Sequence, residues 1–395
     1  TDRRLVAAVH DWGRSLPDSG RTLRTLARVA AVAVLAVTVA VGYVGPATGV
    51  RNLAVLVVWV AWWGGYVASV YLLGNTWPTL NPFRALAESL PSLDRPYPAR
   101  PGAWPSVVGL LLLVWIEVVT PLADDPRLLA TVLVAYTAVT LVGSVVFGAD
   151  SWFDNVDPLS RAFRYYGRLA PIGVEEGRLR LRLPGGALPD TALDGRDDVA
   201  FVVTLLFVTT YDGAVATEPW ASGARAAVEA GLPPLVVYLA AYLGGAALFY
   251  LAYRIAARVG RRRAETYLST DYLARRFAPA LLPIAAGYHL AHNLGSVLAL
   301  VPTLTAVGAA PLSPPASPPQ LAGLPSWFGG LELAFVLLGH LLAVWVAHAT
   351  AYDCFPSRLQ AVRSQYAVTA VMVGYTMLSL WIVTEPYVAP PFIAT

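Results

Sequence analysis

Nine apolar segments of about twenty residues follow one another along the chain, and shorter polar stretches separate them. The segments cover residues 26–45, 52–74, 103–121, 128–148, 198–217, 232–253, 277–301, 327–352 and 364–384. At a rise of about 1.5 Å per residue, a helix of this length crosses a hydrocarbon core of about 30 Å. The pattern therefore predicts an all-α protein, a polytopic bundle of about nine transmembrane helices.

The arginines divide unequally between the two sides that these helices would separate. With a cytoplasmic N-terminus, 25 of the 28 basic residues fall in cytoplasmic segments, and only Arg51, Arg127 and Arg225 fall on the other side. Cytoplasmic loops of membrane proteins carry this kind of positive excess. We therefore predict a multi-pass protein of the cell membrane with its N-terminus inside and its C-terminus outside.

The composition agrees with a lipid bilayer as the main partner. The hydrophobic share is 56% and the charged share 13%, against about 45–50% and about 25% in soluble domains. The net charge of +3 comes from the cytoplasmic segments and suits an anionic leaflet, so it does not indicate a nucleic-acid partner. The single cysteine, Cys354, excludes an internal disulfide and a thiolate metal cluster.

Two polar segments near the start of the chain are expected to lie at the cytoplasmic interface. Residues 1–25 resemble a short amphipathic helix, which would precede a single transmembrane domain of residues 26–395. In residues 75–102, two X-Pro steps forbid a continuous helix. Asn81 before Pro82 is a good N-cap for a short helix over 82–90. The segment is thus expected to be re-entrant or interfacial, and Asn81 to have a structural or gating role.

Two further segments are expected on opposite sides of the membrane. Residues 150–196 form the largest cytoplasmic insertion, and residues 177–183 alternate Arg and Leu with a period of two. This alternation predicts a small strand or hairpin. Residues 302–326 carry no charge and are rich in proline, so we expect an extended outer loop there.

Five ionisable residues lie well inside the predicted spans, where such groups are costly. They are Glu117, Asp212, His289, His292 and His340. Counting residues from the helix ends places them at a similar depth, roughly 18–22 Å from the cytoplasmic side. No arginine occurs at this depth to neutralise the two carboxylates. The residues are therefore candidates for one shared site, with Glu117 and Asp212 as catalytic groups and the three histidines as metal ligands.

A second cluster is expected closer to the cytoplasm. His348 is eight residues from His340, about 12 Å along a helix, which is too far for both to bind one metal. We therefore assign His348 to a separate group with Asp353. Carboxylates beside histidines favour zinc or iron at the main site. A haem b between two histidines is the alternative, and hydrogen-bonded core residues with no ligand are the structural alternative. Under the structural alternative, Asp212-Gly213 would mark the end of a helix.

Several sequence segments resemble those of the membrane proteins known as the fenitrothion hydrolase family. They are LGNTWPTLNPFRALAE (73–88), LVWIEVVTPLADDPR (113–127), TTYDGAVATEPW (209–220), AGYHLAHN (286–293), LGHLLAVWVAHA (338–349) and AVRSQYAVTAVMVGYTMLSLW (361–381). By this resemblance, the motif positions are Asn81, Glu117, Asp212, His292, His340 and His348. His289 departs from the usual pattern, which weakens a His-x-x-His ligand pair. The family name implies hydrolysis of an organophosphate ester.

Three functions fit these residues. The first is an intramembrane, metal-dependent hydrolase of apolar, organophosphate-like esters, in which a bound ion activates water and a carboxylate takes its proton. The second is a transporter of a metal ion or small solute that uses the same residues as a midplane binding site. The third is a haem-binding membrane subunit of a redox complex.

Overall fold

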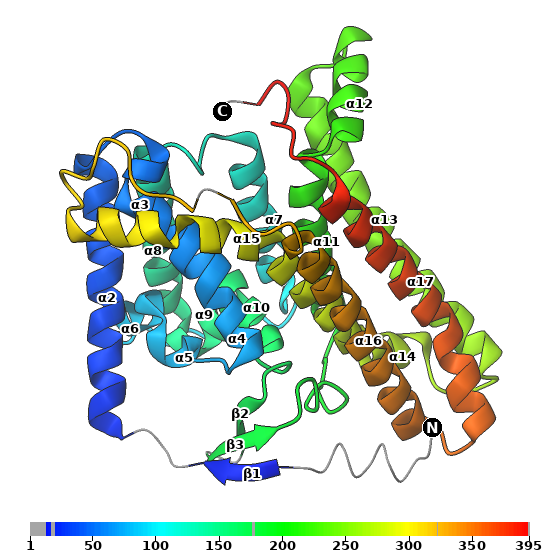
Figure 1. Ribbon diagram of the computed structural model, residues 1–395. Coiled ribbons are helices and arrows are strands. Elements are labelled where there is room, and N and C mark those ends of the chain that lie inside the picture. Colours follow the sequence, from blue (N-terminus) through cyan, green and yellow to red (C-terminus); the bar gives the residue numbers. More distant parts are fainter. Residues whose placement is uncertain (1–12, 17–19, 176–177, 322, 394–395) are drawn as a thin grey trace.

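The computed structural model describes residues 13–16, 20–175, 178–321 and 323–393 of the chain. Eight of its helical segments are long and apolar enough to cross a membrane. They are Arg21–Val44, Leu53–Leu72, Pro126–Phe147, Arg196–Val215, Pro234–Arg263, Thr270–Ala309, Phe328–Cys354 and Arg358–Thr384. The remaining predicted span, 103–121, forms a shorter apolar helix, α7 (Trp104–Val119). The predicted polytopic helix bundle is confirmed (Figure 1).

Helix α11 (Arg196–Val215) forms the centre of the bundle. Sixteen of its 20 residues are buried, and it contacts α7, α13 (Pro234–Arg263), α15 (Leu282–Ala309) and α17 (Arg358–Thr384). By contrast, α2 (Arg21–Val44) at the edge buries only Thr38, Val41 and Gly42. Side chains of α11 therefore face other helices, whereas most of α2 is left to face lipid (Figure 1).

Glycines allow α15 and α16 (Phe328–Cys354) to pack with their backbones in contact. A Cβ atom at Gly287 would lie 2.6 Å from the carbonyl oxygen of Phe335, and one at Gly339 would collide with the carbonyl oxygen of Pro283. Small residues at helix contacts are typical of membrane bundles, where close packing replaces the hydrophobic driving force.

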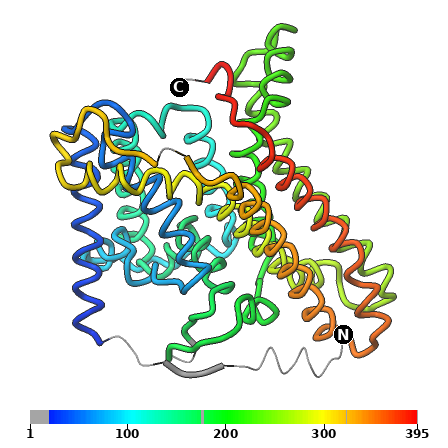
Figure 2. Tube along the Cα trace, in the orientation of Figure 1, coloured from blue at the N-terminus to red at the C-terminus, as the bar shows by residue number. Residues whose placement is uncertain are grey.

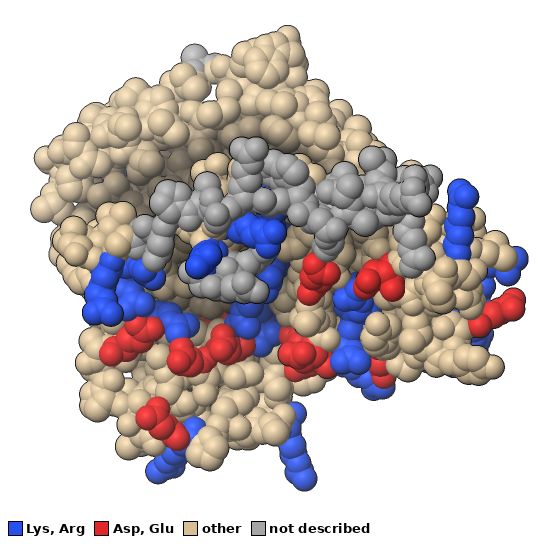
Figure 3. Space-filling view, turned by 90° about the horizontal axis from the view of Figure 1, so that it is seen from below, with Lys and Arg blue, Asp and Glu red and all other residues tan. Residues whose placement is uncertain are grey.

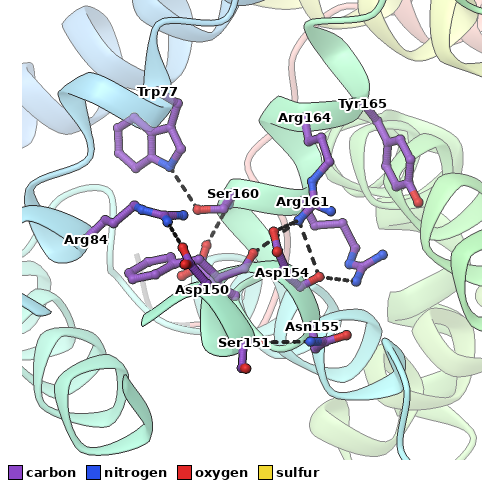
Figure 4. Close-up of polar contacts among 12 residues, drawn as sticks. Trp77, Arg84, Asp150, Ser151, Asp154, Asn155, Ser160, Arg161, Arg164 and Tyr165 are labelled. Carbon is purple, nitrogen blue, oxygen red and sulfur yellow. Dashed lines mark hydrogen bonds and ion pairs between the residues drawn. The ribbon is translucent and has the colours of Figure 1, made fainter. Parts of the chain in front are cut away.

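The broken segment after the second span contains two short helices, α5 (Trp77–Leu80) and α6 (Pro82–Ala87). Asn81 is buried and caps α6 as predicted, because its Oδ1 accepts a hydrogen bond of 3.0 Å from the backbone N–H of Arg84. Its Nδ2 donates to Ser160 Oγ at 3.2 Å, and the indole N–H of Trp77 donates to the same oxygen at 3.3 Å. Figure 4 shows Trp77 reaching Ser160 on α10 (Pro158–Tyr166). Asn81 thus has a structural role.

The predicted hairpin is present, and a third strand extends it. Strands β2 (Ile172–Glu175) and β3 (Arg178–Arg182) pair antiparallel, and β1 (Gly13–Leu16) pairs with the other edge of β3. The interfacial helix predicted for residues 1–25 is therefore wrong at 13–16, which form a strand, and at 21–25, which begin α2. Residues 1–12 and 17–19 of that segment lie outside the described residues. The strand forms because β3 offers it an unpaired edge, which a pattern of local periodicity cannot reveal.

The loop in the outer segment 302–326 is shorter than predicted. Helix α15 includes Pro302 and continues to Ala309. The loop folds back onto this helix: the N–H of Leu321 donates to Ala299 O at 3.2 Å, and the hydroxyl of Thr303 donates to Pro319 O at 2.7 Å. These contacts stabilise the last turns of α15 although Pro302 lacks an N–H donor.

Charged side chains gather at the end of the bundle that carries the three-stranded sheet, as the view from below in Figure 3 shows. The sheet and α12 (Glu218–Glu229) lie at opposite ends of the molecule (Figures 1 and 2). This arrangement agrees with the predicted alternation of the segments between the two sides.

Candidate functional site

Four of the five predicted site residues line one small cavity, which we call the polar niche. Its volume is about 20 Å³, and a single water needs about 10–15 Å³ measured in this way. Ten residues line it: Trp63, Val114, Glu117, Val208, Thr209, Asp212, Tyr288, His289, His292 and Asn293. The niche therefore joins ionisable groups from α7, α11 and α15 around room for about one water molecule.

Asp212 and His292 form a histidine–carboxylate pair in the niche. Asp212 Oδ2 lies 3.7 Å from His292 Nε2, and the two side chains keep 33% and 36% of their surface exposed. The ring of Tyr288 stacks on the His292 imidazole with 5.6 Å between centroids. The pair is thus held in place on one side and remains accessible on another.

Gly213 allows this arrangement instead of ending the helix. Helix α11 continues to Val215, so the interpretation of Asp212-Gly213 as a helix end is wrong. A Cβ atom at Gly213 would collide with the hydroxyl oxygen of Tyr288. The absence of a side chain at 213 is what lets Tyr288 approach Asp212 and cover His292.

His289 lines the niche but also belongs to the core. It is buried, and its Nδ1 lies 3.0 Å from the hydroxyl of Tyr71. Its ring meets the indole of Trp63 edge-on, with 5.1 Å between centroids. These contacts fix the ring orientation, so His289 is a rigid wall of the niche.

His340 does not line the polar niche, which corrects the prediction of a five-residue site. Its Nδ1 lies 2.9 Å from Thr376 Oγ1 on α17. On the same helix, Gly339 faces α15, so the adjacent residue His340 points elsewhere. Counting residues gives the depth of a side chain but not the direction in which it leaves the helix, and this is why the prediction failed.

The two members of the predicted second cluster have different partners. The Nδ1 of His348 lies 3.0 Å from Gln365 Nε2, and its ring meets Tyr352 edge-on at 4.7 Å. Asp353 forms an ion pair with Arg276. Within the described part of the chain, no group of three or more His, Cys, Asp or Glu side chains is arranged to hold a metal ion.

A second, larger cavity adjoins the niche. We call it the apolar cavity; its volume is about 520 Å³, and it lies among α2, η2 (Leu56–Tyr66), α7 and α8 (Pro126–Phe147), above the α5–α6 segment. Its lining comprises Ala27, Ala30, Ala31, Val34, Leu35, Thr38, Val57, Val58, Trp59, Ala61, Trp62, Trp63, Tyr66, Trp77, Leu80, Pro82, Phe83, Leu110, Leu113, Val114, Glu117, Leu122, Leu129, Val132, Leu133, Tyr136 and Leu159. Glu117, Trp63 and Val114 line both cavities. The Glu117 side chain therefore stands between an apolar space and the polar niche.

Several polar groups in the wall of the apolar cavity are bonded within the protein. The hydroxyl of Tyr66 lies 3.0 Å from Thr76 Oγ1, and Thr38 donates to Val34 O at 2.7 Å. Tyr136 donates to Asp157, the N-cap of α10, and burial raises the pKa of this carboxyl. Since these groups have partners in the wall, they do not demand water in the cavity.

Sequence reasoning missed two parts of the site. The segment η2 (Leu56–Tyr66) is a π-helix that supplies Trp63 and much of the apolar wall, and such helices are frequent at functional sites. Glu332 on α16 was also missed. A Cβ atom at Gly295 would lie 3.3 Å from Glu332 Oε1, which places this carboxyl group against α15 three residues beyond His292. The sequence offered one signal for Glu332, because it is the only acidic residue within the apolar segment 327–352.

Comparison with known proteins gives no relative for this arrangement: no family model, no curated protein and no solved structure matches the chain.

Proposed function

We propose that this membrane protein hydrolyses apolar esters that enter from the bilayer. The observation that carries the proposal is the position of Glu117, which lines both the apolar cavity and the polar niche. A substrate in the apolar cavity would place its ester beside Glu117, and water would reach the ester from the niche. The two reactants, which dissolve in different phases, would thus meet at one carboxyl group.

The niche contains the groups that this reaction needs. His292, paired with Asp212 at 3.7 Å, would take a proton from the water as its oxygen attacks the ester carbon or phosphorus. Neither lining, as the structure describes it, includes an arginine. In its protonated form, Glu117 would donate a proton to the departing alcohol oxygen. General acid and base groups of this kind each contribute about 100-fold to 10,000-fold in rate.

A divalent ion is a further part of the proposal. Carboxylates and imidazoles around one niche are donors that zinc or iron accepts. An ion bound by Asp212 and His292 would make the same water more acidic. The steps given above are those of the side chains themselves. A haem bound through His292 Nε2 would require this nitrogen to leave Asp212, whereas the contact of His340 with Thr376 uses Nδ1 and could persist.

The test is ester cleavage by the purified protein in lipid nanodiscs. Nitrophenyl esters of carboxylic and phosphoric acids should release nitrophenol, and Glu117→Gln and His292→Gln should each lower kcat by at least about 100-fold. His348→Gln is the control, because His348 contacts Gln365 outside the niche. Metal analysis and a visible absorption spectrum of the same sample report zinc, iron or haem. Equal rates for the native protein and Glu117→Gln would contradict the proposal.

A further inference from the structure

The apolar cavity is long in the direction of the helices. Along α2 its lining runs from Ala27 to Thr38, and these eleven helical steps correspond to about 16 Å. One leaflet of a bilayer has a hydrocarbon thickness of about 15 Å, half of the total of about 30 Å. The cavity thus has the length of one lipid chain in one leaflet.

Glu117 lies at one end of this length. Helices α7 and α8 are joined by a short turn on the outer side, and Glu117 and Leu129 both line the cavity within a few residues of that turn. The opposite end is formed by Ala27 and by Phe83 on α6, in the segment at the cytoplasmic side. The cavity therefore has a carboxyl group near its outer end and apolar side chains at its inner end.

We propose that the apolar cavity binds a single long hydrocarbon chain whose polar head lies at Glu117 and whose methyl end lies near Ala27. The inference rests on the proposed function only where it identifies that head as the ester to be cleaved. The small side chains of Ala27, Ala30 and Ala31 leave the α2 side of the cavity open for the chain. The absence of arginine from the described lining favours an uncharged head.

Binding can be tested without hydrolysis. The probe is dodecanol with a photoreactive diazirine next to its methyl end, irradiated with the full-length protein in nanodiscs and mapped by mass spectrometry. Phe83 is 5% exposed and lines the inner end of the cavity. Val139 and Val142 on α8 are 61% and 65% exposed and report contact with bulk lipid. We expect labelling near Phe83 in addition to labelling at the two valines.

A pair of variants on α2 distinguishes the cavity from the surrounding lipid. Ala31→Phe would place a ring inside the cavity, so it should abolish labelling near Phe83 and leave Val139 labelled. Ala33→Phe is the matched control, because Ala33 is exposed and does not line the cavity. Unlabelled dodecanol should reduce labelling of Phe83 by the photoreactive probe more than the compact alcohol adamantanol does.

Several results would overturn the inference. Labelling confined to Val139 and Val142, unchanged labelling of Phe83 in Ala31→Phe, or equal competition by adamantanol would each exclude a bound linear chain. A protein that binds dodecanol in this way but cleaves no ester would refute the proposed hydrolysis and leave the binding site intact. Thermal unfolding of both α2 variants checks that each remains folded.

Discussion

His292 Nε2 on α15 lies 3.7 Å from Asp212 Oδ2 on α11, so two helices that are distant in sequence supply one histidine–carboxylate pair. If Asp212 orients His292 for proton transfer, Asp212→Asn should lower kcat for ester cleavage by about 100-fold or more. Asp353→Asn is the control, since Asp353 pairs with Arg276 outside the niche. Steady-state kinetics in nanodiscs is the measurement, and an unchanged kcat in Asp212→Asn would remove Asp212 from the reaction.

The glycine contact between α15 and α16 should determine the stability of the bundle. Gly339→Ala forces a methyl group against Pro283 O, and overpacking of this kind costs about 1–3 kcal/mol. Gly329→Ala on the same helix meets no atom within 4 Å and should leave stability nearly unchanged. Thermal unfolding in detergent compares the two variants. Equal transition temperatures would show that the two backbones can separate without cost.

The buried ion pair between Arg161 and Asp198 should be essential for the cytoplasmic half of the protein. The two side chains are only 6% and 10% exposed, and Tyr165 also donates to Asp198 Oδ1 at 2.8 Å. Asp198→Asn leaves a buried arginine without its counter-charge, which costs about 3–5 kcal/mol.

The neighbouring pair of Arg164 and Asp154 provides the control for this prediction. Its side chains are 41% and 60% exposed, and Figure 4 shows Asp154 and Arg164 beside Arg161. Breaking an exposed pair costs less than about 1 kcal/mol, so Asp154→Asn should unfold close to the native temperature. A similar loss in both variants would mean that burial of Asp198 has no energetic effect.

The sidedness of the membrane segments can be measured with single cysteines. In a Cys354→Ala background, Ala192→Cys and Ser317→Cys both place a thiol at an exposed position. An impermeant maleimide added to intact cells should label position 317 and should reach position 192 only after lysis. Labelling of position 192 in intact cells would invert the topology that the arginine distribution predicts.

The features that sequence patterns predicted well depend on short stretches of chain. Hydropathy over about twenty residues locates a membrane helix, because each helix must satisfy its own backbone hydrogen bonds in lipid. The cap at Asn81 and the alternation in residues 177–183 likewise act through neighbouring residues. These predictions needed no knowledge of which helices touch.

The features that escaped prediction depend on how the helices are rotated and paired. His340 was predicted at the depth of the niche, but its ring contacts Thr376, because the direction of a side chain depends on the packing of α16 between α15 and α17. Nothing in a run of apolar residues distinguishes the wall of a cavity from a surface that faces lipid. The π-helical turns of η2 have no established signature in hydropathy, so the positions of its tryptophans could not be derived.

The exposed position of α2 at the edge of the bundle determines what a ligand of the apolar cavity must displace. A cavity bordered by this helix would take up hydrocarbon from the bilayer when no ligand is bound. Moving a chain from the bilayer into such a space gains almost nothing from the hydrophobic effect, since lipid tails are as apolar as leucine. If the cavity binds such a ligand, discrimination among molecules dissolved in the membrane would depend on their shape and on a polar contact with the carboxyl group of Glu117.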